Sequence, residues 1–594
     1  MTSNPIQPDI AAADPSWQTL AELIADRVQQ APDLELYSFL IDGERQRVLL
    51  SCAALARRVN SVAAWLLAST RPGDRVLIQT PPGLDFVVAF LGCVGCGRIA
   101  VPVFPPQMQR KQRGTDRWQS IFDSAEPAAA LTTQPAANPA HELAVPYLEV
   151  DRHASSDAPD ALLGCDVRSD TPAMIQYTSG STTAPRGVVL THRNLLHNLA
   201  HICRRFGHTS ASRGVIWLPP YHDMGLIGGI LQPIYAGFPV LLMSPLHFLQ
   251  QPVRWLRAIS EFGGTTSGGP NFAYELCAQQ ITPEDCAGLD LSRWEVAFVG
   301  AEPVAAKTLD RFAAAFEPYG FRRQAFYPCY GLAEGTLLVS GANKLRGIAI
   351  QNVSAVELES NRFKPLSPGD AAGRQLVGCG HSLDDQTILV VDPDTMRPAK
   401  NDQIGEIWVR GPSVASGYWN SPQATEATFG AILAATGEGP FLRTGDLGYL
   451  CDGQLFITGR LKDLIILAGR NHYPQDIEQT VQQCHSAIRR DGCAAFGIEM
   501  DGEEQLVVVA EVRRRADLRQ GATDDWRLDS EAEGLEQSPE IVAAIRSAVF
   551  QQHGARVASV QLVSAASILK TPSGKKRRQA CRAKYLAECA KQVV

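Results

Sequence analysis

The residues best suited to chemistry in this sequence lie at positions 177–188, which read YTSGSTTAPRGV. An apolar run leads into small hydroxyl residues and glycines, and a single cation, Arg186, follows. Small residues allow backbone N–H groups to approach a phosphate, hydroxyls donate to its oxygens, and a cation balances its charge. The segment is not a Walker loop, because the order G-x-x-x-x-G-K-[ST] is absent. Taken alone, it indicates either a phosphate-binding loop or an ordinary polar turn.

Two carboxylates stand in sequence contexts that favour a role in binding. Glu334 ends the segment YGLAE, whose aromatic and apolar residues are unusual around a surface glutamate. A carboxylate is the ligand that a hard cation bridging phosphates requires. Asp446 ends the triplet TGD, and its two oxygens can accept hydrogen bonds from a vicinal diol, which the family resemblance given below implies to be that of a ribose. TGD alone is a weak signal, since Gly-Asp pairs are common in turns.

A basic run, KTPSGKKRR, occupies residues 570–578 near the C-terminus. Its composition alone indicates a solvated patch. A flexible glycine loop could instead move an ammonium group between a carboxylate and a phosphate, and the family resemblance given below implies this role for Lys575. One well-placed donor of this kind stabilises a transition state by roughly 3–4 kcal/mol. Lys576 is the neighbour that could be confused with it.

The elements that must position these residues alternate between strand and helix. Residues 16–70 have apolar side chains at helical spacing, and β-branched runs begin after residue 74. The expected strands are 74–80, 99–104, 214–219, 240–243 and 295–299. This alternation predicts an α/β fold with largely parallel sheets.

The texture of the sequence changes after residue 404. Short strands at 406–410 and 453–457 lie near turns and predict a small β-rich subdomain. From residue 464 a small α+β domain is expected, with a helix at 474–484, a strand at 505–512, a helix at 540–553 and a strand at 557–563. Residues 516–540 hold eight acidic residues and few apolar ones, which predicts a solvated loop.

Composition excludes several classes of function. The chain has 594 residues, of which 45% are hydrophobic, so it can bury a large core and suggests more than one domain. A net charge of −7 argues against nucleic acid or an anionic membrane as a partner. The uncharged run at 224–246 contains prolines and glycines, which favour a broken helix and a buried strand over a membrane span. Fourteen scattered cysteines and no signal peptide predict a cytoplasmic location, with Cys93 and Cys96 as buried thiols.

The segment TSGSTTAPRGV resembles the phosphate loop of the adenylate-forming superfamily, which includes acyl-CoA synthetases, luciferases, peptide-synthetase adenylation domains and fatty acyl-AMP ligases. Thr183 replaces a frequent glycine and Arg186 a lysine, so the contacts of the arginine, a planar fork rather than a point charge, are in doubt. Further motifs follow in the family's order. They are WLPPYHDMGLIG at 217–228, GGPNFAYELC at 268–277, GAEP at 300–303, YGLAE at 330–334, TGD at 444–446 and GRLKD at 459–463.

This resemblance implies roles for individual residues. The implied ATP- or AMP-binding residues are Thr178, Ser179, Gly180, Ser181, Thr182, Arg186, Gly300, Ala301, Glu302, Tyr330, Gly331, Ala333, Asp446 and Arg460. It implies Lys575, Glu334 and His222 as catalytic residues, with Mg²⁺ held by the glutamate. It implies an acyl pocket at Met224, Gly225 and Phe272, and a hinge at Lys462. From position alone, His222 could equally be a core histidine, and Lys462 an exposed lysine in a linker.

The motifs at 217–228, 268–277 and 330–338, with GRNHYPQDIE at 469–478, are similar to fatty acyl-AMP ligases more than to CoA ligases. A stretch of 42 residues, 335–376, separates two motifs and looks like the insertion that restrains the small domain in this branch. An ordinary long surface loop is the alternative. The expected large domain, of two α/β sheet subdomains and a β-rich one, spans 1–461 with the insertion at about 345–376. A small mobile α+β domain spans 462–594.

The implied reaction joins a medium- or long-chain fatty acid to AMP, with ATP and Mg²⁺ as cofactors and release of pyrophosphate. The family then implies acyl transfer to the phosphopantetheine thiol of an acyl-carrier protein, of the polyketide or nonribosomal peptide synthase type. A long-chain fatty acyl-CoA synthetase is the alternative enzyme. A binding protein that kept the fold without turnover is the alternative from another class, and only Thr183 and Arg186 favour it.

Overall fold

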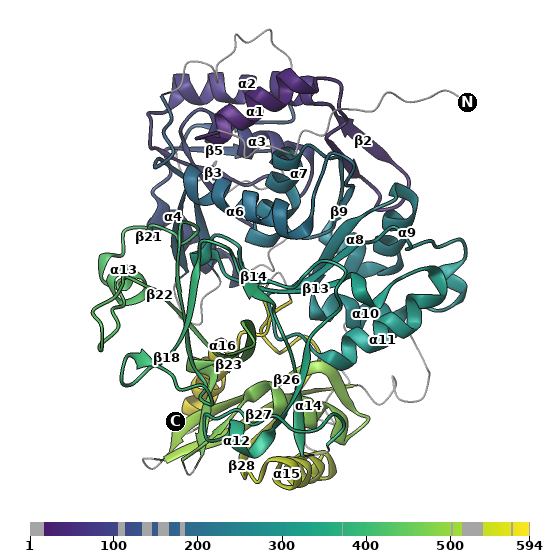
Figure 1. Cartoon of the computed structure of the whole chain (residues 1–594), viewed down its shortest axis with the longest axis vertical. Coiled ribbons are helices and arrows are strands. Elements are labelled where there is room, and N and C mark those ends of the chain that lie inside the picture. The colour runs from purple at the N-terminus through teal and green to yellow at the C-terminus, as the bar shows by residue number, and fades with distance from the viewer. Residues whose placement is uncertain are drawn as a thin grey trace.

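A computed structural model describes most of the chain (Figure 1). The described residues are 17–104, 113–133, 145–152, 166–178, 185–370, 372–467, 469–500, 503–513, 538–571 and 574–592. The expected phosphate loop falls largely outside them, as do most of the acidic residues of 516–540. The helices and strands gather into a large upper body and a smaller lower unit that contains the C-terminus.

The first large sheet has nine strands in the order β17-β14-β13-β12-β11-β9-β10-β1-β2. The six strands from β13 to β1 run parallel, and the strands at both edges pair antiparallel. The strands are β1 (Tyr37–Leu40), β2 (Arg47–Leu50), β9 (Gly214–Ile216), β10 (Val240–Met243), β11 (Thr266–Pro270), β12 (Val296–Gly300), β13 (Phe326–Gly331), β14 (Leu338–Gly341) and β17 (His381–Ser382). The expected strands at 214–219, 240–243 and 295–299 are therefore confirmed to within a few residues.

The second large sheet has seven strands in the order β21-β8-β7-β4-β3-β5-β6. Its strands are β3 (Arg75–Ile78), β4 (Ile99–Pro102), β5 (Ala129–Thr132), β6 (Tyr147–Glu149), β7 (Pro172–Thr178), β8 (Arg186–Thr191) and β21 (Gly417–Tyr418). The β6, β5, β3, β4 and β7 strands run parallel. Strand β8 pairs antiparallel with β7, and β21 pairs antiparallel with β8. The predicted α/β class with largely parallel sheets is thus confirmed.

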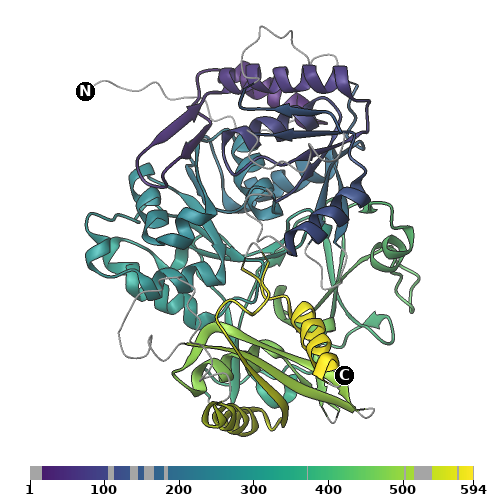
Figure 2. The same cartoon turned by 180° about the vertical axis from the view of Figure 1, so that it is seen from behind.

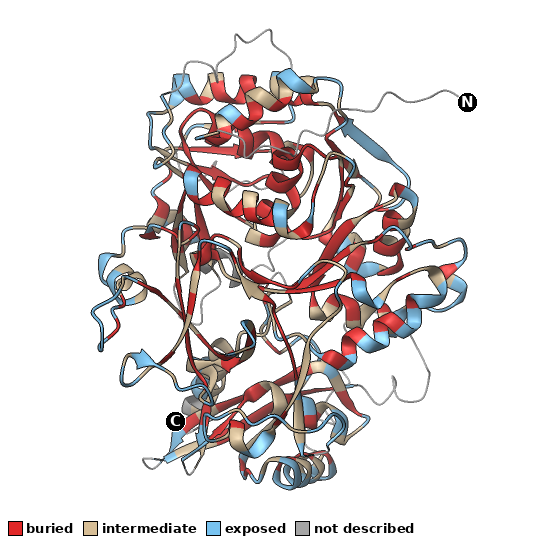
Figure 3. Cartoon of the chain, viewed as in Figure 1, coloured by how far each residue is buried: buried red, intermediate tan, exposed pale blue. Residues whose placement is uncertain are grey.

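Helices cover both sheets, and the two sheets share one hydrophobic core. The helices are α1 (Leu20–Gln30), α2 (Cys52–Ser69), α3 (Leu84–Gly95), α4 (Arg113–Ala125), α6 (His192–Phe206), α8 (Pro245–Gln250), α9 (Val253–Phe262), α10 (Asn271–Gln280) and α11 (Ala306–Phe316). Figure 3 shows the central strands as buried and the outer faces of the helices as exposed. Every residue of α3 except Asp85 is buried, which explains its almost uniformly apolar sequence. Cys93 and Cys96, at its C-terminal end, are buried as expected.

The expectation of helices throughout 16–70 is wrong in its middle, where β1 and β2 separate α1 from α2. Each of these strands is only four residues long, too short to show a clear alternation of polar and apolar residues. Their place in the sheet depends on β10, some two hundred positions later, which pairs in parallel with β1. A contact so distant in sequence leaves no local pattern.

The β-rich region after residue 386 is a five-stranded antiparallel sheet in the order β19-β18-β20-β22-β23. Its elements are β18 (Thr387–Asp392), β19 (Arg397–Pro398), β20 (Gly405–Arg410), α13 (Pro422–Phe429), β22 (Leu442–Cys451) and β23 (Gln454–Arg460). Residues 345–376, the expected insertion, form β15 (Ile350–Ser354), α12 (Ala355–Leu358) and β16 (Gly373–Val377). Phe363 of this segment stacks on Tyr449 of β22, with 4.2 Å between ring centroids and 9° between planes. The segment is therefore packed onto the β-rich sheet.

The lower unit has a three-stranded sheet, β26-β27-β28, and a hydrophobic core of its own. Its elements are β24 (Ile465–Leu467), β25 (Arg470–His472), α14 (Pro474–Cys484), β26 (Ile488–Met500), β27 (Glu503–Val512), α15 (Pro539–His553), β28 (Val557–Val563) and α16 (Arg578–Gln592). The helices expected at 474–484 and 540–553 match α14 and α15. The architecture is the α+β one predicted for this region.

A buried carboxylate ties the ends of the lower unit together. Glu478 of α14 accepts hydrogen bonds from Lys576, at 3.0 Å, and from Arg578, at 2.7 Å. Burial alone would raise the pKa of Glu478, but Arg578 and Lys576 outweigh it and lower the pKa to about 2. Because this pKa is lower in the folded chain, the carboxylate stabilises the fold above its unfolded pKa and loses that effect as the pH falls towards 2.

We predict that Glu478→Gln lowers the free energy of unfolding of the lower unit by about 3–5 kcal/mol, since it leaves two buried cations unpaired. Urea unfolding at pH 7 measures this loss. Between about pH 4.3 and pH 2, the wild-type chain should lose stability in a way that the variant does not. Glu588→Gln is the control: it removes an exposed pair with Lys584 and should cost less than about 0.5 kcal/mol. Equal losses in the two variants would contradict the prediction.

Candidate active site

A cavity of about 1740 Å³ opens where the large body, the β-rich sheet and the lower unit meet. Small-ligand sites usually measure roughly 300–1,000 Å³, so there is room for a nucleotide together with a second substrate. Twelve of the residues singled out from sequence line it. They are Thr178, His222, Met224, Ala301, Glu302, Tyr330, Gly331, Ala333, Glu334, Asp446, Arg460 and Lys575.

Asp446 is the centre of a hydrogen-bonded group in this cavity. Tyr330 of β13 donates from Oη to Oδ2 of the aspartate over 2.7 Å. Arg460 donates from Nε to Oδ1 over 2.6 Å, because β22 and β23 pair with these two residues opposite each other. The pKa of Arg460 is raised by Asp446, and that of Tyr330 by burial and the same carboxylate. Each carboxylate oxygen keeps a second lone pair, so a vicinal diol can still be bound.

Glu334 lies in a single 3-10 turn, η7 (Ala333–Gly335), directly after β13. Its Oε1 accepts a hydrogen bond from Oη of Tyr418 over 2.8 Å. The guanidinium carbon of Arg186 lies 5.2 Å from the centre of the Tyr418 ring. Tyr418 therefore links the cation that follows the expected phosphate loop to the carboxylate expected to hold Mg²⁺. One carboxylate suits Mg²⁺, which is commonly held by few carboxylates together with phosphate oxygens and water, and Thr178 lines the same cavity.

The expected phosphate loop connects β7 to β8. These strands pair antiparallel, with Thr178 opposite Arg186. Ser179, Gly180, Ser181 and Thr182 lie outside the described residues. The hairpin places both ends of the loop beside Tyr418 and the cavity wall, through Arg186 and Thr178.

His222, Met224 and Gly225 lie at the start of a π-helix, η3 (Met224–Leu231), which continues into α7 (Gln232–Ala236) and then β10. π-helical turns are rare and frequently occur at functional sites. His222 pairs with Asp223, at 2.5 Å between Nδ1 and Oδ1. Burial would raise the pKa of Asp223, but His222 and hydrogen bonds lower it. The region is the broken helix and strand that the sequence predicted, and the described residues contain no helix long and apolar enough to cross a membrane.

Gly300 ends β12 and Ala301 follows with a φ of +64°, so the chain turns sharply at the cavity wall. The next residue, Glu302, accepts a hydrogen bond from the backbone N–H of Phe272 over 2.7 Å. Burial raises the pKa of Glu302 to about 7. Gly300 is packed against Cys329, whose carbonyl oxygen would lie 2.7 Å from an added Cβ. It therefore shapes the turn from outside the cavity wall.

The loop that carries Lys575 rises from the lower unit into the centre of the molecule (Figure 2). Backbone bonds between Thr571 and Lys575 close it into a tight turn, in which Gly574 has a φ of +85°. An added Cβ on Gly574 would lie 2.8 Å from the ring of Phe272. Phe272, expected in an acyl pocket, thus lies against the lysine loop.

The two neighbouring lysines of this loop have different partners. Lys576 pairs with Glu478, at 3.0 Å, and with Asp491, at 3.2 Å. Lys575 instead lies near Arg460, which together with burial lowers its pKa to about 8, while Asp446 acts in the opposite direction. Both lysines line the cavity, but Lys576 is paired with carboxylates of the lower unit, whereas Lys575 lies beside Arg460 and Asp446 of the large body, as expected from sequence.

Lys462 lies in the short turn η8 (Leu461–Asp463), between β23 and β24. Its carbonyl oxygen accepts a hydrogen bond from Gln579 over 2.9 Å, so it is at the junction of the two units. The insertion reaches the same junction. Arg374 pairs with Asp476 at 2.9 Å, and Glu359 pairs with Arg470 at 3.2 Å.

Residues 24–419 match the family of AMP-binding enzymes, and residues 462–523 match a second family described as Disco-interacting protein 2-like, AMP domain. A medium-chain-fatty-acid–[acyl-carrier-protein] ligase, JamA of Moorena producens, is 43% identical, with 96% of each chain covered. A long-chain-fatty-acid–AMP ligase, FadD26 of Mycobacterium tuberculosis, is 35% identical, covering 97% of this chain and 98% of the relative. The chain belongs to the AMP-binding enzyme family and, within it, to the fatty acyl-AMP ligases.

A solved structure supports the same placement. The fatty acyl-adenylate ligase from Legionella pneumophila, determined with acyl adenylate and pyrophosphate, is 37% identical with a TM-score of 0.72, and 96% of each chain is covered. The family resemblance recognised from the motifs is thus confirmed. Other relatives, at 36–37% identity, carry the name fatty-acid–CoA ligase, so names alone do not decide the final acyl acceptor.

Two contributors to the site were missed from sequence. Tyr418 lies in the segment SGYWN, 84 positions after Glu334, and only the antiparallel pairing of β21 with β8 places it beside Arg186. Arg374 was included only as part of a long insertion, and its contact with Asp476 required the docked lower unit. A lone tyrosine or arginine without a motif offers no local signal that could have identified either residue.

We predict that Gly225→Ala destabilises the chain, because the added Cβ would lie 2.1 Å from the carbonyl oxygen of Pro219. Overpacking of this kind costs about 1–3 kcal/mol. Gly228→Ala, in the same π-helix, is the matched comparison, since its Cβ would meet a Leu337 methyl group at an ordinary 3.5 Å. Thermal unfolding of both variants measures the difference, and a Gly228→Ala loss as large as that of Gly225→Ala would contradict it.

Proposed function

We propose that this chain uses ATP to convert a medium- or long-chain fatty acid into acyl-AMP and pyrophosphate, and then transfers the acyl group to a carrier-protein thiol. One observation carries the proposal. Lys575, from the lower unit, enters the cavity beside the Asp446, Arg460 and Tyr330 group of the large body. The lower unit thereby supplies an ammonium group to the site, and the large body supplies a carboxylate that can bind a diol.

In the first reaction, an oxygen of the fatty carboxylate attacks the α-phosphorus of ATP in line with the leaving group. A new oxygen–phosphorus bond forms, and the bond from the α-phosphorus to the bridging oxygen breaks as pyrophosphate leaves with the electron pair. The ammonium of Lys575 donates to the non-bridging oxygens, where negative charge builds up. Asp446 binds the ribose hydroxyls and fixes the orientation of the nucleotide.

Mg²⁺, held by Glu334, would neutralise phosphate charge and supply no other chemistry. Tyr418 orients this carboxylate through its hydrogen bond. Arg186 stacks on the same ring and provides a fixed positive charge near the phosphate loop. These three residues would therefore act as one unit on the phosphate side of the site.

An apolar part of the cavity is available for the acyl chain. The walls of this part come from β9, β10, β12 and the π-helix, and include Ile216, Met224, Val240 and Phe298. Apolar walls with a few polar groups at one end suit a fatty acid whose carboxylate reaches the nucleotide.

The names of relatives that act on acyl-carrier proteins support the same class of final acceptor. We place the reaction in the cytoplasm, because the described cysteines are free thiols and many are buried.

Replacing Lys575 tests the mechanism. Lys575→Ala should lower the rate of acyl-AMP formation by roughly 100- to 1,000-fold, since it removes one donor to the developing charge. Pyrophosphate release from ATP, Mg²⁺ and laurate measures the rate. Lys584→Ala, which removes an exposed lysine of α16, is the control and should leave the rate unchanged. Absence of pyrophosphate from the wild-type chain with any fatty acid would favour a nucleotide-binding protein without turnover.

A second measurement separates the carrier-protein ligase from an acyl-CoA synthetase. The wild-type chain is mixed with ATP and laurate, and then with either free CoA or a holo-carrier protein, and the products are identified by mass spectrometry. We expect acylated carrier and little CoA ester. A CoA ester formed at a rate matching that of pyrophosphate release would establish the synthetase instead.

The insertion contributes a further prediction. Glu359→Ala combined with Arg374→Ala removes both ion pairs between the insertion and the lower unit. We expect faster amide hydrogen exchange in β24, β25 and the start of α14, because these elements lose two ion pairs with the insertion and keep only contacts such as the hydrogen bond from the Asn471 N–H to the Glu359 carbonyl. Lys364→Ala, an exposed residue of the same segment, is the control. Unchanged exchange in the double variant would show that these pairs do not restrain the lower unit.

A further inference from the structure

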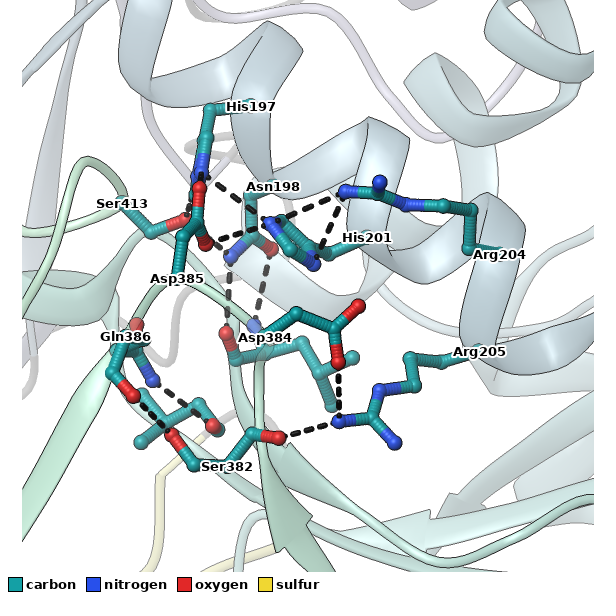
Figure 4. Close-up of polar contacts among 12 residues, drawn as sticks. His197, Asn198, His201, Arg204, Arg205, Ser382, Asp384, Asp385, Gln386 and Ser413 are labelled. Carbon is teal, nitrogen blue, oxygen red and sulfur yellow. Dashed lines mark hydrogen bonds and ion pairs between the residues drawn. The ribbon is translucent and has the colours of Figure 1, made fainter. Parts of the chain in front are cut away.

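A cluster of two histidines and an aspartate lies outside the cavity, and Figure 4 shows the three side chains facing one another. His197 and His201 are four positions apart in α6, so their side chains project from the same face of the helix. Asp385 comes from the turn between β17 and β18, 184 positions after His201. None of the three is among the residues that line the active-site cavity.

The ligand-type atoms of the cluster converge on one point. Nε2 of His197 lies 2.7 Å from Oδ2 of Asp385, and Nε2 of His201 lies 2.9 Å from Oδ1. The two Nε2 atoms are 3.2 Å apart. In a tetrahedral zinc site with bonds of about 2.0–2.1 Å, ligand atoms are roughly 3.4 Å apart. Shifts of a few tenths of an ångström would therefore open this cluster to an ion.

We propose that His197, His201 and Asp385 form a binding site for a divalent transition metal of the zinc class, with water as the fourth ligand. Imidazole nitrogens and a carboxylate oxygen are typical ligands of Zn²⁺, whereas Mg²⁺ and Ca²⁺ prefer oxygen alone. Asp385 is half exposed, which provides a route for the ion and leaves space for the water. The buried His201 and the largely buried His197 supply the fixed side of the site.

The surroundings of His197 favour coordination through Nε2. Its other ring nitrogen, Nδ1, lies 2.7 Å from Oγ of Ser413, which is fully buried. Asn198 donates to the same Oγ over 2.9 Å and so holds the serine in place. Metal-bound histidines almost always make such a hydrogen bond with the second nitrogen, which orients the ring towards the ion.

Two arginines of α6 also face the cluster. The guanidinium of Arg204 lies 3.3 Å from Nε2 of His201 and would oppose a bound cation, but this side chain is exposed and can move away. Arg205 is engaged by Asp384, at 3.2 Å, and by the carbonyl of Ser382.

The position of the site indicates what an ion would do. It would join α6 of the large body to the turn between β17 and β18, where the β-rich sheet begins. Ser413 connects this site to the region of Glu334. Its carbonyl oxygen accepts a hydrogen bond over 2.6 Å from Thr336, which lies two positions after Glu334. The ion would thus stabilise the junction behind the active site without touching the substrates. The inference stands independently of the proposed reaction.

The test uses the full chain without a histidine tag, treated with a chelator and then titrated with Co²⁺ or Zn²⁺. We expect one equivalent of Co²⁺ to produce the visible absorption of a tetrahedral complex, and Zn²⁺ to raise the thermal unfolding temperature. A large excess of Mg²⁺ should not displace the Co²⁺. Wild-type protein that shows neither the absorption nor the stabilisation would overturn the proposal and leave a hydrogen-bonded Asp–His cluster.

Variants locate the binding. Asp385→Asn should weaken Co²⁺ binding by at least roughly 10- to 100-fold, the usual effect of losing even an outer partner of a metal ligand. His201→Gln should do the same, but His201 is buried and its replacement could unfold the chain, so the exposed Asp385 is the deciding position. His381→Gln, on the adjacent β17 and bonded to Gly453, is the matched control. Equal affinity in Asp385→Asn and His381→Gln would also overturn the site.

Discussion

The buried carboxylate of Glu478 is the interaction on which the arrangement of the site depends. It holds Lys576 and Arg578 in the lower unit, and a carboxylate so buried remains charged only because two cations surround it. Successive residues of an extended segment point to opposite sides. Since Lys576 is held inside the lower unit, Lys575 is directed out of it and into the cavity. The ion pairs of Lys576 thus leave Lys575 as the neighbouring lysine that lies beside Arg460 and Asp446.

The same cavity brings together residues with very different local environments. Burial raises the pKa of Glu302 to about 7, whereas the charge of Arg460, followed by burial, lowers that of Lys575 to about 8. Both groups are therefore less charged than they would be in water, in the absence of a substrate. A polyphosphate entering the cavity would favour the charged form of Lys575 and would raise its pKa again.

The insertion contacts both the β-rich sheet and the lower unit. Phe363 anchors it on Tyr449 of the β-rich sheet, while Glu359 and Arg374 reach the lower unit. The Arg374–Asp476 pair is partly buried and Arg470 of the second pair is exposed, and both pairs join the packed hairpin to the lower unit. The length and polarity of the segment were visible in the sequence. Its anchoring ring and its partners were not.

Sequence alone determined the family and the α/β class, and it singled out twelve residues that line one cavity, because these depend on local patterns such as a carboxylate in an aromatic segment or a lysine beside a glycine. Tertiary structure alone decided that β1 and β2 interrupt the first helices, that Tyr418 joins Arg186 to Glu334, and that Asp385 meets the histidines of α6. Each of these depends on a contact between segments far apart in the chain. Such contacts are set by the packing of whole sheets and helices, which leaves no periodic or compositional trace near the residues involved.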